Sequence, residues 1–203
     1  IGRIAAPQIQ GQSAYYLQLN GGKRNISIDL NWPEAREAAL RLCQKSDVIV
    51  ENFRPGTMKT FGLDYETVRR ENPSVVYVSM SGYGQNTPWS TRPAFAPTVQ
   101  AESGATQTQM DHFGDDLSRP VTDWASHADI YTGLEGAIAV LAGLNKRNAT
   151  GIGLHGDVSM MATMLAVNER LHAQINELDA ADEPLALGAP ESPIFKVADG
   201  SFV

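Results

Sequence analysis

The sequence predicts an α/β fold built on a doubly wound parallel sheet. Two short runs rich in β-branched residues, 47–51 and 75–79, each end in a polar loop, and a polar helical segment joins them. An alternating run at 26–30 precedes them, which gives the order strand, helix, strand, helix, strand with short connections. This order implies parallel strands whose carboxyl-end loops meet at one edge of the sheet, where ligands bind.

The first quarter of the chain contains one predicted strand and one predicted helix. Residues 1–25 are rich in Gln, Gly and Asn and are expected to be an irregular connection that ends in a turn at 20–22. The run 26–30 alternates like a strand, and 34–45 carries apolar residues at helical spacing. Cys43, the single cysteine, falls on that apolar face, so we expect a core residue and no disulfide.

The middle of the chain alternates between regular elements and loops. A polar loop at 52–56 leads into a weak helix, and a second helix is predicted at 64–71, before the strand 75–79. Residues 82–124 are dominated by loop signals, with a short helix possible at 98–104. A loop region of this length in a compact domain is usually functional.

The last third is predicted to contain two helices, followed by a linker and a hairpin. A strong helix is predicted at 130–145, and 150–153 turns the chain back toward a second helix at about 159–179. Residues 181–193 resemble a linker, and a hairpin from 194 begins a second, smaller domain. One side of the first helix carries the apolar residues Leu134, Ala137, Ile138, Leu141 and Leu144.

Composition excludes several function classes. A net charge of −7 provides no basic face for nucleic acid or an anionic membrane. No apolar run approaches the ~18 residues of a membrane span, and no signal peptide is present, so we expect a cytoplasmic protein. The four histidines form no recognised ligand motif, so no metal site is expected.

The loop that follows the strand 47–51 has the clearest binding chemistry. Asn52, Phe53 and Arg54 offer an amide, an aromatic face and a guanidinium, which suit a phosphate and an adenine ring. A simple turn with a solvated arginine is the alternative. The glycines of 82–84 lack the remainder of a dinucleotide fingerprint, and no Gly-x-Ser-x-Gly elbow is present. A carboxylate nucleophile is the covalent option that remains.

Asp129 is the candidate for that carboxylate. It stands directly before the predicted helix 130–145, where backbone amides and the positive end of the helix dipole would keep it ionised at neutral pH. From the local sequence alone, a plain N-cap is the more common role for such a residue. A catalytic role therefore needs independent support.

That support comes from short motifs spread along nearly the whole chain. They occur at 20–30, 47–56, 62–63, 72–73, 81–85, Asp129 with Gly133, Leu141, 150–151, 156–160 and 198–200. Their combined order and spacing resemble the class III coenzyme A transferases and their acyl-CoA racemase relatives, the CaiB/BaiF family. The combination is more specific than any one motif.

The resemblance implies a large Rossmann-like domain, a smaller domain reached through linkers, and a homodimer of two interlocked chains. Residues 1–180 would be the large domain without its N-terminal part, 181–193 the linker, and 194–203 the start of the small domain. The Gly-rich active-site loop of the family would lie outside this chain.

The resemblance also implies the site residues. The nucleophilic aspartate of the family falls on Asp129, and further coenzyme A contacts fall near Thr60 and in 93–96. The implied substrates are acyl-CoA and a small carboxylic acid, with no tightly bound cofactor, no metal and no nucleic acid or membrane partner. The main coenzyme A contacts fall on Ile28, Asp29, Leu30, Asn31, Asn52, Phe53 and Arg54.

Some positions depart from the family pattern. Racemases of the family carry a His-acidic pair near the positions of Phe95 and Ala96, and neither residue can move a proton. Thr60, Pro93 and Ala96 replace an arginine, a lysine and a glutamate of some transferases. We therefore expect coenzyme A transfer through an aspartyl anhydride and an aspartyl-CoA thioester, with a racemase and a non-catalytic CoA-binding protein as alternatives.

Overall fold

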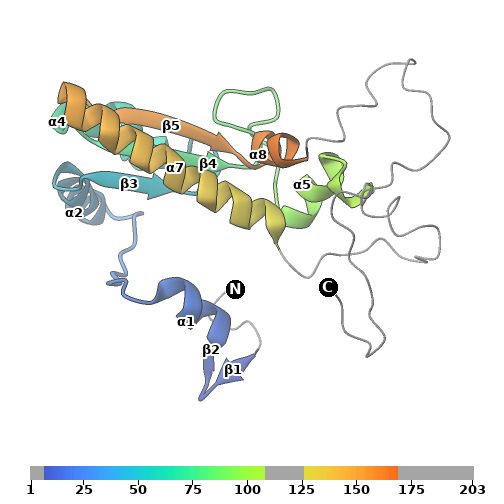
Figure 1. Cartoon of the computed structure of the whole chain (residues 1–203). Coiled ribbons are helices and arrows are strands. Elements are labelled where there is room, and N and C mark those ends of the chain that lie inside the picture. Colours follow the sequence, from blue (N-terminus) through green and yellow to red (C-terminus); the bar gives the residue numbers. More distant parts are fainter. Residues whose placement is uncertain (1–6, 108–125, 169–203) are drawn as a thin grey trace, which may run out of the picture. The chain divides into compact units, whose positions relative to one another are not determined.

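The computed structural model describes residues 7–107 and 126–168 (Figure 1). It divides into two compact units, Ile1–Ala35 and Arg36–Val203, and each is described by itself.

Several sequence predictions fall outside the described residues. They are the linker at 181–193, the hairpin from 194 and the second half of the helix at 159–179. The domain boundaries at residues 180 and 193 remain predictions.

The N-terminal unit is more regular than its composition predicts. Strand β1 (Gln8–Ile9) pairs antiparallel with β2 (Gln12–Ser13), and helix α1 (Ala14–Asn20) follows. The hydroxyl of Ser13 caps this helix by accepting a hydrogen bond from the Tyr16 amide at 3.3 Å. The prediction of an irregular connection over 1–25 is therefore wrong for this segment.

The strand predicted at 26–30 is also absent, because residues 23–29 have no regular secondary structure. A strand needs a partner to accept its backbone hydrogen bonds, and none of the described strands pairs with this run. Ile26 is 66% exposed. The predicted turn at 20–22 is confirmed, since Gly22 has a φ of +74° and the Lys23 amide donates to the Asn20 carbonyl.

The second unit is built on a parallel sheet with the order β3-β4-β5 (Figure 1). Strands β3 (Val48–Glu51) and β4 (Val76–Ser81) confirm the predictions at 47–51 and 75–79. Strand β5 (Leu154–Ser159) was not predicted, because its sequence includes His155, Gly156 and Asp157 and lacks a β-branched run. The second unit is thus a mixed α/β structure.

Helix α7 (His127–Thr150) covers one face of the sheet and lies in front of it in Figure 1. Val76, Val78 and Val158 are buried beneath Ala139, Val140 and Leu144 of this helix. Glycines permit the close approach: a Cβ added at Gly143 would lie 2.5 Å from Val76 Cγ1, and one at Gly136 would lie 2.6 Å from Met80 Sδ.

The opposite side of α7 is apolar but exposed. Leu144 packs on the sheet, whereas Leu134, Ile138 and Leu141 are 59%, 65% and 66% exposed in this chain. We call Ile130, Leu134, Ile138 and Leu141 the α7 stripe, since their spacing places them along one side of the helix.

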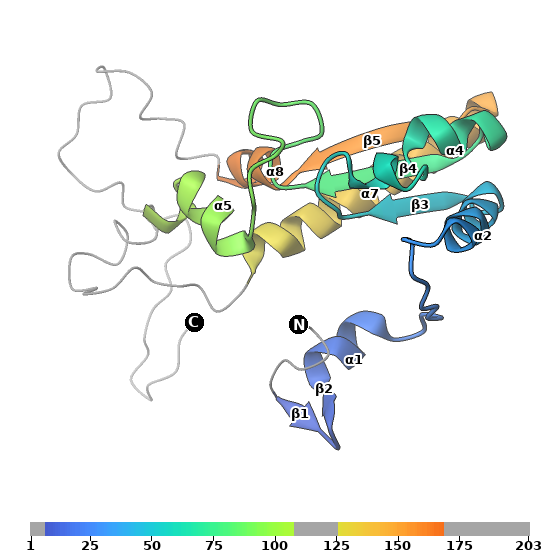
Figure 2. The ribbon, with the colours of Figure 1, turned by 180° about the vertical axis from the view of Figure 1, so that it is seen from behind.

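The other face of the sheet is covered by α2 (Pro33–Gln44) and α4 (Tyr65–Glu71), and α4 lies in front of the sheet in Figure 2. Val75 and Tyr77 are fully buried there, and the Tyr77 hydroxyl donates to the Leu63 carbonyl at 2.9 Å. Burial raises the pKa of Tyr77 well above its usual range. Helices on both faces thus form three layers around two core clusters.

Cys43 packs against the second of these clusters. It is partly buried among Leu40, Ile49 and Met58, as its place on the apolar face of α2 predicts. Burial raises the pKa of its thiol. This environment fits the expected packing role of the residue.

A third cluster forms beyond the carboxyl ends of the strands. Helix α5 (Ala96–Glu102), α8 (Met160–Val167) and the first turn of α7 bury Val99, Ala128 and Met164 together. Helix α5 begins two residues before the helix predicted at 98–104. None of the helices in the described ranges is long and apolar enough to cross a bilayer.

Candidate active site

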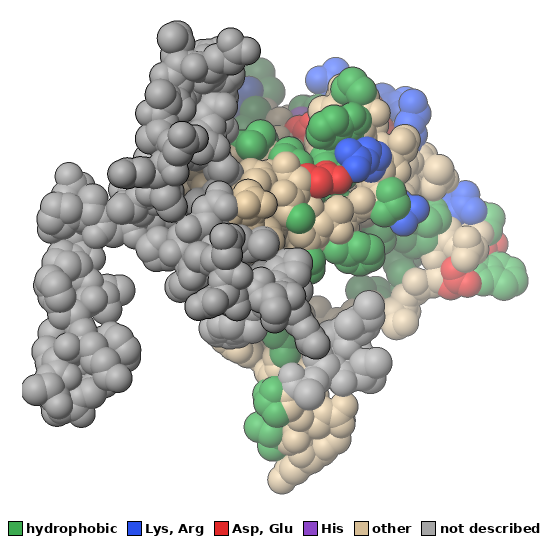
Figure 3. Space-filling view, turned by 90° about the vertical axis from the view of Figure 1, so that its right-hand side faces the viewer, with side chains coloured by type: hydrophobic (Ala, Val, Ile, Leu, Met, Phe, Trp, Pro, Cys, Tyr) green, Lys and Arg blue, Asp and Glu red, His purple; other side chains and the backbone are tan. Residues whose placement is uncertain are grey.

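The carboxyl ends of β3 and β4 deliver two loops to the same edge of the sheet, beside the first turn of α7. A cavity of about 380 Å3 lies at this edge. Seen from this side, the sheet unit presents hydrophobic, acidic and basic side chains close together (Figure 3). We call this cavity the Asp129 pocket; its walls include Asn52, Phe53, Arg54, Pro55, Ser81, Gly82, Ser90, Arg92, Pro93, Ala94, Phe95, Asp129 and Met160.

Asp129 lies in the first turn of α7 and is not its N-cap. The helix begins at His127, three residues before the predicted start, and Ser126 occupies the N-cap position. The Ile130 amide donates to the Ser126 carbonyl at 3.0 Å, which is the first helical hydrogen bond. The prediction of an N-cap role for Asp129 is therefore wrong, although the residue remains near the positive end of the helix dipole.

A side chain from α5 fixes the start of α7. The Ser126 hydroxyl makes no capping hydrogen bond, and the Ala128 amide donates instead to Gln100 Oε1 at 3.3 Å. Gln100 is only 7% exposed. It supplies one of the acceptors that the unpaired amides of a helix N-terminus require. The first turn, and Asp129 with it, is thereby tied to α5.

The Asp129 side chain is exposed toward solvent at the wall of its pocket. Enough protein surrounds the carboxyl group that partial burial raises its pKa above the ordinary value. No cation among the described residues forms an ion pair with it. Burial thus opposes the helix dipole that was expected to keep this carboxyl ionised.

The structure brings Asn52, Phe53 and Arg54 to the same pocket as Asp129. Asn52 Nδ2 donates to the Met80 carbonyl at 3.0 Å, which ties the loop to β4. The Phe53 amide donates to Glu51 Oε2 at 2.9 Å, and Glu51 is only 7% exposed. These bonds fix the loop backbone while the Phe53 ring stays half exposed.

The other coenzyme A contacts inferred from sequence are not among the residues that line the Asp129 pocket, apart from the segment 93–96. Ile28, Asp29, Leu30 and Asn31 belong to the N-terminal unit, where Asp29 Oδ1 accepts hydrogen bonds from the Asn31 amide and side chain. The Thr60 hydroxyl donates to the Thr57 carbonyl at 2.7 Å.

The segment 93–96 divides between the pocket and the core. Pro93 and Phe95 line the Asp129 pocket, whereas Ala96 begins α5 and is buried at 3% exposure. The pocket therefore receives no acid or base from these positions.

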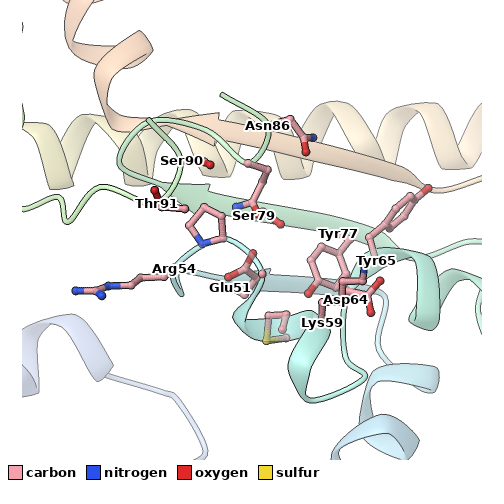
Figure 4. Close-up of a pocket in the computed structure, with 14 residues that line it drawn as sticks. Glu51, Arg54, Lys59, Asp64, Tyr65, Tyr77, Ser79, Asn86, Ser90 and Thr91 are labelled. Atoms are coloured by element: carbon pink, nitrogen blue, oxygen red, sulfur yellow. The ribbon is translucent and has the colours of Figure 1, made fainter. Parts of the chain in front are cut away.

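A second cavity, of about 410 Å3, is shown in Figure 4 and shares lining residues with the first. Arg54, Pro55 and Ser90 line both cavities. We call it the Tyr77 cavity. Figure 4 shows Glu51 in the middle of the lining residues and Asp64 beside Tyr77, while the Arg54 side chain extends away from both carboxylates.

Two further side chains give the Tyr77 cavity hydrogen-bonding groups. Lys59 lines it and supplies a cation one residue before Thr60, which sequence reasoning missed. The side-chain nitrogen of Gln85 is buried and has no hydrogen-bond partner among the described residues. The Gln85 backbone is held in place, because its amide donates to Asp157 Oδ2 at 2.9 Å.

Sequence reasoning also missed Arg92, which lines the Asp129 pocket. Its guanidinium donates to Glu102 at 2.5 Å and lies over the rings of Tyr83 and Trp89. Burial, and then the hydrogen bond to Glu102, raise the pKa of Tyr83. No group of three or more His, Cys, Asp or Glu side chains in the described part of the chain could hold a metal ion.

Comparison with known proteins decides the family. A model of CoA-transferase family III matches residues 2–203. The chain belongs to CoA-transferase family III. The resemblance inferred from the short motifs is confirmed.

Named relatives and a solved structure agree with this family III assignment. Succinyl-CoA:mesaconate CoA-transferase of Haloarcula hispanica is 34% identical over 165 residues, or 79% of this chain and 41% of the relative. Succinyl-CoA:glutarate CoA-transferase of Homo sapiens is 31% identical over 202 residues, or 97% of this chain and 45% of the relative. The crystal structure of a CaiB/BaiF family protein from Brucella suis matches with a TM-score of 0.81 and 30% identity, over 98% of this chain and 54% of that one.

The chain thus spans about half the length of the family III proteins it matches. The match to a CaiB/BaiF structure agrees with the mixed α/β architecture and its parallel sheet.

Proposed function

We propose that this protein transfers coenzyme A from an acyl-CoA donor to a carboxylic acid acceptor, with Asp129 as the nucleophile. The observation that carries the proposal is the shared pocket: Asp129 of helix α7 lines the same cavity as Asn52, Phe53 and Arg54, which follow strand β3. An attacking carboxylate and a CoA-binding loop are both needed at one place for this reaction.

The reaction proceeds through two kinds of covalent intermediate. An Asp129 carboxylate oxygen attacks the thioester carbonyl, the C–S bond breaks, and a mixed anhydride and a CoA thiolate form. The thiolate attacks the aspartyl carbonyl, which releases the donor acid and leaves an aspartyl-CoA thioester. The acceptor carboxylate repeats these steps in reverse and regenerates Asp129. Each step exchanges one anion for another, so the cycle requires no ATP.

The first turn of α7 supports this chemistry. Amides at a helix N-terminus stabilise negative charge, and negative charge develops on the attacked carbonyl oxygen in every step. Partial burial of Asp129 weakens its solvation by water, which makes the carboxylate a stronger nucleophile once it is ionised. Gln100 fixes the turn that carries it.

The two adjoining cavities suit the two ends of coenzyme A. The thioester end lies in the Asp129 pocket, and the nucleotide end extends past Arg54 into the Tyr77 cavity. Arg54 and Lys59 supply cations for phosphate groups in a chain whose net charge is −7. The unpartnered nitrogen of Gln85 is a donor for an acceptor atom of the bound nucleotide.

The acids exchanged are proposed to be small dicarboxylates. The names of both relatives above pair succinyl-CoA with a second dicarboxylic acid, mesaconate or glutarate. No observation favours racemisation, because Phe95 and Ala96 cannot exchange a proton with the substrate.

The full protein is proposed to be a cytoplasmic, interlocked homodimer with a Rossmann-like large domain. The exposed α7 stripe supports the homodimer, since four apolar side chains along one side of a helix are normally covered by another protein surface. Helices on both faces of a parallel sheet support the Rossmann-like description.

Hydroxylamine trapping tests the proposed nucleophile. The full-length protein is incubated with an acyl-CoA donor and hydroxylamine, and the peptide that contains Asp129 is analysed by mass spectrometry. We expect a hydroxamate at Asp129, because hydroxylamine attacks aspartyl anhydrides and aspartyl thioesters. Asp129→Asn is the control and should give no adduct at that position. Exchange of the substrate α-proton with deuterated water and no adduct would support a racemase instead.

A further inference from the structure

We propose that Arg92 is the specificity residue of the Asp129 pocket and that it binds the second, non-reacting carboxylate of a dicarboxylic acid acceptor. This inference rests on the proposed transfer through Asp129. It adds a residue that recognises the acid to the residues that bind coenzyme A and carry out the chemistry.

The contacts of Arg92 leave part of its guanidinium available. Its Nη2 donates a hydrogen bond to Glu102 Oε1 at 2.5 Å. The Tyr83 hydroxyl donates to the other carboxylate oxygen, Glu102 Oε2, at 2.6 Å. Glu102 therefore binds Arg92 through one oxygen, whereas arginine–carboxylate pairs are frequently bidentate. A guanidinium carries five N–H donors, so several stay available for a ligand.

The orientation of the guanidinium is fixed by aromatic rings. The guanidinium carbon lies 5.2 Å from the centroid of Tyr83 and 5.0 Å from that of Trp89, and the two rings meet edge to face at 5.9 Å. Tyr83 is only 5% exposed, so its ring is anchored in the core, whereas Trp89 is 51% exposed. A planar cation held in this way loses little entropy when it binds a carboxylate.

The electrostatics of the reaction require such a cation. Asp129, the coenzyme A thiolate and both acids are anions, and a dicarboxylate brings one more negative charge than the chemistry itself needs. Among the described residues that line the pocket, Arg54 and Arg92 are the cations. Arg54 also lines the Tyr77 cavity, which we propose for the nucleotide. Arg92 is therefore the cation of the pocket that remains to bind the second carboxylate of the acceptor.

The test compares two acceptors of equal length on the full-length enzyme, glutarate and valerate. The readout is the ratio of kcat/KM for glutarate to kcat/KM for valerate. Arg92→Gln should lower this ratio about tenfold to a hundredfold, the effect of losing one charge-assisted hydrogen-bonding partner. Arg92→Lys, which keeps the charge without the planar fork, should recover part of it. Arg147→Gln, at the other end of α7 where Arg147 pairs with Asp47, should leave the ratio unchanged.

Each contrary result has a distinct meaning. An equal fall with both acceptors would show that Arg92 supports only the local structure, and a rise confined to the KM for acyl-CoA would place it on a coenzyme A phosphate; both overturn the inference. A wild-type enzyme with no preference for glutarate would overturn it as well. Absence of an Asp129 hydroxamate in the wild-type enzyme would instead reject the proposed function. If Arg92→Gln does not fold, Arg92→Lys carries the test through the same ratio.

Discussion

Asp129 experiences two opposing electrostatic effects. The first turn of α7 favours its charged form, whereas partial burial disfavours that form and raises its pKa. The first effect could be predicted from the sequence, because a carboxylate next to a run with helical apolar periodicity is recognisable in the sequence itself. The second depends on which loops surround the carboxyl group.

The raised pKa makes Asp129 destabilising at neutral pH. Between its unfolded and folded pKa values, the folded state binds more protons than the unfolded state, so the free energy of unfolding falls as pH rises through that window. Asp129→Asn, which cannot ionise, should therefore be more stable than the wild type at pH 8. The difference should shrink as pH is lowered toward about 4, near the ordinary carboxyl pKa.

Urea unfolding at several pH values measures this difference. Glu71→Gln, which changes an exposed carboxylate on α4, is the matched control for removal of one negative charge. A stability gap for Asp129→Asn that is independent of pH, or a loss of stability at pH 8, would contradict the expectation.

Single residues of the site differ in how far the sequence could reveal them. The location of Asn52, Phe53 and Arg54 was predictable because they directly follow a clear strand, and the ends of parallel strands share one edge; their binding of coenzyme A stays a prediction. Gln100 and Arg92 were not, since their partners Ala128 and Glu102 lie 28 and 10 residues away. Both residues occur within the segment 82–124, where no periodic pattern guides the reading.

At the scale of elements, helix α7 depends on glycine for its distance from the sheet. Gly136 and Gly143 are seven residues apart, so they lie on the same side of the helix and both face β4. Glycine lowers intrinsic helix stability, and here that loss is offset by close packing against Val76 and Met80.

Alanine substitutions along α7 separate packing from intrinsic helix propensity. Gly143→Ala should lower the free energy of unfolding by about 1–3 kcal/mol, because its Cβ would meet Val76 and overpack the core. Gly133→Ala should raise it by about 0.5–1 kcal/mol, because nothing lies within 4 Å of its Cβ position. Urea denaturation of both variants checks the pair; equal effects would show that the helix does not pack as described.

The predicted elements succeeded where a local signal agreed with its tertiary environment. Strands β3 and β4 are β-branched runs that pair with each other in the sheet, with β4 largely buried and β3 partly buried, and the sequence predicts both. The run 26–30 has an alternating strand pattern, but none of the described strands lies beside it. Strand β5 pairs with β4, but its sequence has only a weak strand pattern. Pairing in a sheet is a property of two segments, so a pattern in one segment cannot establish it.

At the scale of the whole molecule, the α7 stripe needs a covering surface. Its side chains are between 52% and 66% exposed in this chain, which represents about half the length of its relatives. In the proposed full-length homodimer we expect the stripe to be buried.

Cysteine labelling measures that burial. Leu141→Cys in the full-length protein should react with a maleimide more than about tenfold more slowly than Lys146→Cys, an exposed position on the same helix. The wild-type protein, with Cys43 as the cysteine of this segment, provides the background rate. Equal labelling rates would show that the stripe stays open to solvent, and light scattering would report whether the protein is a dimer.

The proposed nucleophile and the two pocket arginines are carried by different kinds of segment, and this has an evolutionary consequence. Asp129 is carried by a long helix packed on the sheet, whereas Arg54 and Arg92 are carried by loops. Loops tolerate insertions and substitutions that packed elements do not. Under the proposed mechanism, a lineage can therefore change which acid it accepts by altering the loops, while the Asp129 carboxylate stays where the helix holds it.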